Sequence, residues 1–243
     1  MSTKFSVKVW DLPTRVFHWS LLLAICGSFY AVWVAEDMVL HSRFGYAVLA
    51  LCLFRLVWGV VGGHWSRFAS FVPSWRQTRA YLSSSQAMEA QPGHNPLGAW
   101  SVYAFLLLLL LQVASGLGSD DDVLFSGPLT PLLSSEWVSW LTFYHSEVGK
   151  TVLLVLILVH IAAVLFYTLV KRQALIQTMW HGVRQLPVDV VASVDTWPRR
   201  LSALLTAGCD NPNLSAEVET RLSISNWLKI TSKLRSMSLR SMA

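Results

Sequence analysis

Apolar residues gather in four long stretches of this chain, and polar residues fill the segments between them. The stretches run approximately over residues 16–35, 39–61, 97–117 and 148–170, and the fourth is expected to begin earlier, near Phe143. A helix of roughly 20 apolar residues crosses a hydrocarbon core of about 30 Å, and lipid forces such a segment to be helical. The pattern therefore predicts an all-α fold, a transmembrane four-helix bundle.

The charges of the polar segments alternate along the chain. The first and third loops are acidic, with Glu36, Asp37, Asp120, Asp121, Asp122 and Glu136. The N-terminal arm, the second loop and the segment after the fourth stretch are basic, with Lys4, Lys8, Arg15, Arg67, Arg76, Arg79, Lys171 and Arg172. Because basic loops stay on the cytoplasmic side, we expect both termini of the bundle in the cytoplasm.

Two segments fall outside the four stretches. Residues 132–141 of the third loop are expected to form a short helix at the outer interface, where Trp137 and Trp140 share a face. The composition changes after Gly182, and a tail with apolar and basic positions at helical intervals follows. We therefore divide the chain into a transmembrane domain, residues 1–184, and an amphipathic or partly disordered cytoplasmic tail, residues 185–243. The tail is expected to touch anionic membrane lipid, with a specific docking role as the alternative.

Composition supports a membrane protein. Hydrophobic residues make up 53% of the chain and charged residues only 14%, whereas soluble domains carry about 25% charged residues. The net charge of +5 is explained by the basic loops, so no nucleic acid partner is expected. The three cysteines form no C-x-x-C-H motif, which excludes covalently attached haem.

Four histidines lie in the apolar stretches, where an ionisable side chain is costly and usually functional. By depth they form two pairs: His41 with His145 near the outer side, and His18 with His160 further in. Two neutral imidazoles from different helices can bind one iron from opposite sides, which suits electron transfer. The spacing therefore predicts two haem b groups, each with two histidine ligands.

Two of these histidines share a local pattern, because Gly45 follows His41 and Gly149 follows His145 by four residues. Residues four apart lie on one helix face, so each glycine lets a flat macrocycle approach the backbone. His145 and His160 are fifteen residues apart, which corresponds to about 60° around an α-helix and roughly 22 Å along it. One helix can therefore serve both haems.

Some assignments stay open. His64, His94 and His181 are read as ordinary polar loop residues, although His64 is an alternative ligand for the inner haem. Arg55, within an apolar stretch, is expected either to bind the propionates of the inner haem or to reach the headgroups. Arg43, beside His41, is expected to play the matching outer role, with headgroup contact as its alternative.

Several motifs together resemble one family, that of the bacterial cytochrome b561 and the b-type cytochrome of nickel–iron hydrogenases. They are the opening V-W-D-L-P-T-R-V-F-H-W at residues 9–19, H-x-x-x-G-Y at 41–46, R-L-V-W-G at 55–59, G-H-N-P-L-G at 93–98, the histidines 145 and 160, and the segment 171–182. The resemblance covers about residues 8–184. It implies a multi-pass protein of the bacterial inner membrane whose ligands are His18, His41, His145 and His160.

The resemblance also implies a function, electron transfer between the quinone pool and a redox partner. The partner is expected to be a hydrogenase or a periplasmic c-type cytochrome, and an electron-transfer subunit is favoured over a stand-alone enzyme. A superoxide oxidase that reduces quinone is the alternative, although the acidic third loop disfavours an anionic substrate. A haem-free transporter is disfavoured because the four stretches contain no mid-span Pro, Asp or Glu.

Overall fold

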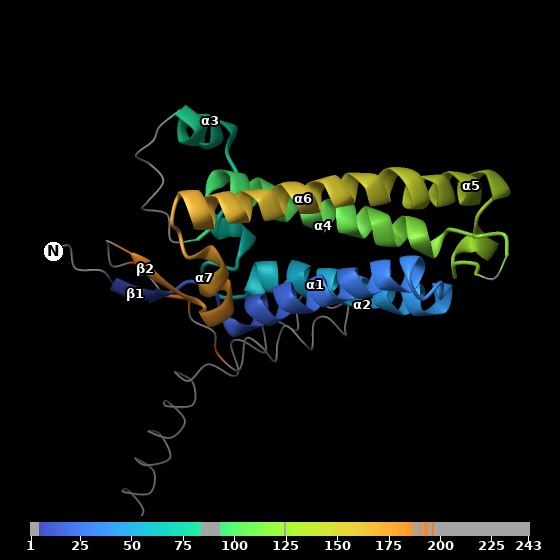
Figure 1. Cartoon of the computed structure of the whole chain (residues 1–243), viewed down its shortest axis with the longest axis horizontal. Coiled ribbons are helices and arrows are strands. Elements are labelled where there is room, and N and C mark those ends of the chain that lie inside the picture. Colours follow the sequence, from blue (N-terminus) through green and yellow to red (C-terminus); the bar gives the residue numbers. More distant parts are fainter. Residues whose placement is uncertain are drawn as a thin grey trace, which may run out of the picture.

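Four long helical segments run side by side and give the molecule an elongated shape (Figure 1). The computed structural model describes residues 5–83, 93–123 and 125–186, together with 190, 192, 193 and 196. The predicted amphipathic tail beyond residue 196 lies outside these residues. The spans are α1 (Leu12–Trp33), α2 (Met38–Val61), α4 (Pro96–Leu117) and a fourth segment built around α6 (Lys150–Leu165). All four are long and apolar enough to cross a membrane, which confirms the predicted helical bundle.

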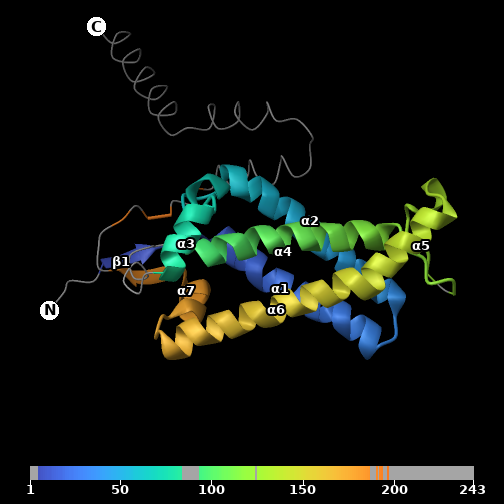
Figure 2. The same cartoon turned by 90° about the horizontal axis from the view of Figure 1, so that it is seen from above.

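The helices are arranged as two pairs, seen from two directions in Figures 1 and 2. α1 packs along α2, α2 along α4, and α4 along α6. One end of the bundle carries His18, the segment before α1 and the segment after the fourth span. The other end carries His41. We call them the His18 end and the His41 end.

Each of the first three spans begins at a polar cap. The side chains of Asp11, Asp37 and Asn95 accept bonds from backbone N–H groups three residues later, at 2.9, 2.8 and 2.7 Å. Such caps satisfy N–H groups that lack a partner at a helix start. The Asp11 cap explains why α1 begins at Leu12, four residues before the apolar stretch that predicted it.

The fourth span is longer than its apolar stretch predicted. It begins with α5 (Ser135–Phe143), passes through a π-helical turn, η3 (Tyr144–Gly149), and continues through α6 into a second π-helical turn, η4 (Phe166–Val170). Its 36 residues correspond to about 54 Å, well beyond a core of about 30 Å. The helix expected at residues 132–141 is therefore the first part of the fourth span, not a separate interfacial helix.

Shorter elements cover the His18 end. They are α3 (Trp75–Ser83), α7 (Leu175–His181), β1 (Phe5–Lys8), β2 (Val183–Leu186) and a 3₁₀ turn at Phe68–Ser70. A second 3₁₀ turn, Thr130–Leu132, lies at the His41 end. β1 and β2 pair antiparallel, with Phe5 opposite Leu186. The sequence analysis missed this ladder because its strands have only four residues each and lie at opposite ends of the domain. The expected domain boundary after residue 184 falls inside β2.

Apolar side chains point both inward and outward. The interior packs Ala24, Val48, Cys52, Leu106, Leu109, Val113 and Leu153. Large apolar side chains also lie on the outer surface: Leu23, Val60 and Leu158 are 70%, 71% and 64% exposed. A soluble protein rarely exposes so much apolar surface, so these faces contact lipid.

A fully buried carboxylate joins the loops of the His18 end. Besides capping α1, Asp11 accepts bonds from Ser66 Oγ at 2.6 Å and from the backbone N–H of Gly63 at 3.2 Å. The indole N–H of Trp58 donates to both of its oxygens at 3.2 Å. Asp11 thus ties the start of α1 to the end of α2 and the loop that follows.

Replacing this carboxylate tests its contribution to stability. Asp11→Ala should lower the free energy of unfolding by about 2–4 kcal/mol, because it removes a cap and leaves buried donors without an acceptor. Thermal unfolding in detergent, followed by circular dichroism, measures the change. Asp37→Ala is the matched control, since it removes an exposed cap with one bond and should cost about 1 kcal/mol. Equal losses in the two variants would contradict the proposed role of Asp11.

Candidate haem sites

The structure brings two of the four predicted ligands together at the His41 end. His41 lies in the first turn of α2 and His145 in the π-helical turn of the fourth span, and their ring centroids are 5.9 Å apart with the planes at 83°. Two histidine nitrogens, each about 2 Å from a shared metal, place their ring centroids about 6 Å apart. The measured separation therefore suits one metal ion between these two rings.

Both imidazoles are oriented by a backbone carbonyl of a neighbouring helix. His41 Nδ1 lies 3.1 Å from Ser28 O on α1, and His145 Nδ1 lies 2.8 Å from Gln112 O on α4. His41 Nδ1 also lies 3.0 Å from Ser28 Oγ. A carbonyl oxygen only accepts, so the two carbonyl bonds form in the tautomer whose Nδ1 carries the proton, which leaves the Nε2 lone pair for a metal. This is the arrangement that fixes a metal-binding histidine, whose remaining N–H is held by an acceptor beside the ligand shell.

Three residues of α4 surround His145, and the sequence analysis missed all of them. Gln112 Nε2 donates to the backbone oxygen of His145 at 2.9 Å, and Ser115 Oγ lies 3.3 Å from its Nδ1. A Cβ at Gly116 would lie 2.7 Å from His145 Cε1, so a glycine lets the ring lie against α4. The available signal was Gln112 itself, an amide directly after the six leucines at 106–111.

His18 and His160 approach each other at the other end of the bundle. They come from α1 and α6, and a charge on His160 would act on His18. His18 Nδ1 is buried and has no hydrogen-bond partner in the described part of the chain. The His160 ring lies edge-on to Phe105 of α4, with centroids 5.4 Å apart. The two rings are therefore within electrostatic range of each other, and His160 also packs against α4.

The two H-x-x-x-G patterns have different surroundings. A Cβ at Gly45 would meet nothing within 4 Å, whereas one at Gly149 would collide with Gln112 Oε1. Space beside Gly45 agrees with the expected approach of a macrocycle. Gly149 instead makes room for an amide from α4. Arg43, also predicted at this end, has an exposed side chain.

Arg55 is a buried cation near the His18 end, with only 3% of its surface exposed. Its Nη1 donates to Ser66 O at 2.9 Å, and its guanidinium lies 4.9 Å from the Phe68 ring centroid and 6.0 Å from that of Phe71. A buried guanidinium is stabilised by an anion, and a haem propionate has the required charge.

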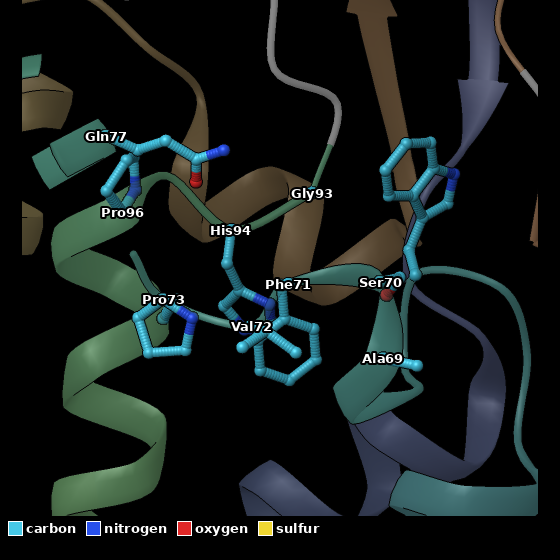
Figure 3. Close-up of a pocket in the computed structure, with 11 residues that line it drawn as sticks. Ala69, Ser70, Phe71, Val72, Pro73, Gln77, Gly93, His94 and Pro96 are labelled. Carbon is cyan, nitrogen blue, oxygen red and sulfur yellow. The ribbon is translucent and has the colours of Figure 1, made fainter. Parts of the chain in front are cut away.

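His94, expected to be an ordinary loop residue, lines a cavity of about 410 Å³ between the α2–α3 connection and the start of α4. Its ring contacts those of Trp10 and Phe71, with centroid distances of 4.6 and 4.3 Å. Figure 3 shows His94 beside Phe71 in this cavity. Within the described residues its Nδ1 is buried without a partner. Burial, reinforced by the nearby Arg55 charge, lowers the pKa of His94 to about 3, so its imidazole is neutral at physiological pH. The other lining residues include Trp65, Gln77, Gly93 and Pro96.

The donor sets fit haem. Within the described residues no group of three or more His, Cys, Asp or Glu side chains gathers in one place, as a bare transition-metal site requires. The predicted ligands instead lie in two pairs, one from α1 and α6 and one from α2 and the fourth span. A pair of imidazoles is sufficient when a porphyrin supplies the four remaining nitrogen ligands of iron.

The comparisons agree with this chemistry. Residues 9–182 match the family described as prokaryotic cytochrome b561. A probable Ni/Fe-hydrogenase B-type cytochrome subunit of Azotobacter vinelandii is 28% identical over 221 residues, which cover 76% of this chain and 90% of the relative. The corresponding protein of Rhodobacter capsulatus is 26% identical over 224 residues, or 76% and 83% of the two chains.

A probable Ni/Fe-hydrogenase 1 B-type cytochrome subunit of Escherichia coli is 24% identical over 135 residues, which cover 44% of this chain and 57% of the relative. No solved structure matches the chain. The family match covers all four spans and the positions of His18, His41, His145 and His160. The chain is a multi-pass, membrane-bound b-type cytochrome that belongs to the prokaryotic cytochrome b561 family.

Proposed function

We propose that this cytochrome carries electrons across the bacterial inner membrane through two haems, one held by His41 and His145 and the other by His18 and His160. The observation that carries the proposal is the pair at the His41 end, whose rings are 5.9 Å apart. Both of its Nδ1–H groups are held by carbonyls of neighbouring helices, at 3.1 and 2.8 Å. When bound, haem b supplies a one-electron iron couple with no open position for substrate.

The protein's own groups have separate tasks in this relay. The backbone oxygens of Ser28 and Gln112 orient the two imidazoles at the His41 end. Arg55, on which the buried Asp11 carboxylate also acts, would hold a haem propionate at the His18 end. His145 and His160 are separated by fifteen residues of one helix, or roughly 22 Å, so the fourth span connects the two sites. The apolar faces of the spans exclude water between them.

The cavity beside His94 is the proposed quinone site. Its size lies within the range of small-molecule pockets, and it combines aromatic walls with a small number of polar groups, as such pockets do. The neutral imidazole of His94, whose Nδ1 is buried without a partner in the described residues, can accept a hydrogen bond from a quinol hydroxyl and orient the quinol. The basic loops of the His18 end support a cytoplasmic location for this cavity.

The redox partner is proposed to act at the His41 end. The relatives are named as hydrogenase subunits, which favours a hydrogenase over a periplasmic c-type cytochrome. α5 extends the fourth span beyond the length of a bilayer core, toward the acidic segment of the third loop.

Adding hydrogen to membranes that contain the candidate hydrogenase and this cytochrome should reduce the haem. Reduction only by a c-type cytochrome would exclude the hydrogenase.

Histidine substitutions test the two haem sites. The wild-type chain should carry two haems, and His145→Ala and His160→Ala should each retain one, because each change removes one of the two ligands of a single iron. Haem per chain is measured by pyridine haemochrome assay, and the remaining haem by reduced-minus-oxidised spectra. His64→Ala is the control and should retain both. If His64→Ala loses a haem while His160→Ala keeps two, the assignment at the His18 end is wrong.

A substitution of His94 tests the quinone site. His94→Phe keeps an aromatic ring against Trp10 and Phe71 but cannot accept a hydrogen bond, so quinol oxidation should fall on the order of 10-fold at unchanged haem content. Because the pKa of His94 is about 3, the wild-type rate should show no loss from His94 protonation between about pH 5 and pH 8. Stopped-flow haem reduction by a short-chain quinol measures both effects. His181→Phe, on an exposed residue, is the control, and equal rates in the two variants would exclude the cavity.

A further inference from the structure

Gln112 and His145 hold each other through two hydrogen bonds in opposite directions. The imidazole of His145 donates to the backbone oxygen of Gln112 at 2.8 Å, and the amide of Gln112 donates to the backbone oxygen of His145 at 2.9 Å. The first bond orients the ring. The second bond reaches a carbonyl inside the π-helical turn Tyr144–Gly149.

The π-helical turn decides the direction in which His145 points. In an uninterrupted α-helix, two side chains fifteen residues apart point in directions that differ by about 60°. Two side chains fourteen residues apart differ by about 40° in the opposite sense. A π-helical turn accommodates one extra residue, so His145 and His160 are related as if fourteen residues separated them. Without this turn the His145 ring would be displaced by roughly 100° around the helix.

In a π-helical turn the backbone hydrogen bonds join residues i and i+5, whereas an α-helix joins i and i+4. Such turns are rare. Here an additional donor from α4 supports the turn. The amide of Gln112 fits because residue 149 is a glycine. A Cβ at this position would collide with Gln112 Oε1. That oxygen is buried without a partner in the described part of the chain, so the amide makes its one side-chain bond to His145.

We propose that Gln112 is a positioning residue for the haem at the His41 end, which it controls by holding the π-helical turn and the imidazole of His145. The inference rests on the proposed haem ligation by His41 and His145. Gln112 acts only through His145. The hydrogen bond from Nδ1–H to a carbonyl increases the electron donation of a ligating imidazole and stabilises ferric iron. Weakening the hydrogen bond between His145 Nδ1–H and the Gln112 carbonyl should raise the reduction potential of the haem at the His41 end.

The test compares Gln112→Met with Leu111→Met. Gln112→Met removes the donor and keeps the side-chain length, whereas Leu111 is a neighbouring residue that is 45% exposed on the lipid-facing surface. Both changes are made in the full chain and in a His160→Ala background, where only the haem at the His41 end is expected. Redox titration and low-temperature electron paramagnetic resonance report the potential and the ligand geometry.

Gln112→Met should shift the potential of this haem upward and change its low-spin resonance, or release this haem alone, and Leu111→Met should do neither. Gln112→Glu should restore the wild-type spectrum, because its carboxylic acid stays protonated in an apolar site and donates to the same carbonyl. A Gln112→Glu spectrum that matches Gln112→Met would overturn the proposal.

The other possible results also decide the question. Unchanged potential and spectrum in Gln112→Met would show that His145 is positioned without the amide. Loss of both haems from an inserted Gln112→Met chain would show that Gln112 supports the whole bundle, not one ligand. A wild-type chain without haem would overturn the proposed function as well, whereas two haems in indistinguishable variants would overturn only this inference.

Discussion

An imidazole inside a membrane has an N–H group that needs an acceptor where no water is available. At the His41 end this acceptor is a main-chain carbonyl of the neighbouring helix, Ser28 O for His41 and Gln112 O for His145. A carbonyl inside a helix already accepts an intrahelical bond and has one more lone pair, so these additional bonds require close packing between the helices. The orientation of the two imidazoles therefore depends on contacts between spans.

The two ends of the bundle differ in which residues provide hydrogen-bond partners for buried polar side chains. At the His41 end the supporting groups, Ser28, Gln112 and Ser115, belong to the spans themselves. At the His18 end Asp11 and Ser66, which lie outside the spans, form one buried network with Arg55 of α2. Loops can supply charged groups and a cavity because they begin outside the hydrocarbon core. The His18 end is thus suited to anions and protons, and the His41 end to a precisely oriented metal ligand.

Two identical sequence patterns have acquired different structural roles in this fold. Gly45 and Gly149 each follow a histidine by four residues, yet one borders open space and the other accommodates the Gln112 amide. Residue spacing describes only one helix. The difference arises from the facing helix, which places a long polar side chain beside one glycine and none beside the other.

The sequence alone was sufficient to identify four spans, since lipid permits few backbone conformations. It also singled out four histidines as candidate ligands, since lipid penalises unpaired ionisable groups. It did not reveal the π-helical turn, the role of Gln112, the buried carboxylate of Asp11 or the burial of His94. Each of these depends on residues far apart in the chain, such as positions 11 and 66 or 112 and 145. Local patterns report the solvent around a segment, whereas only the tertiary structure decides which polar groups of different segments meet.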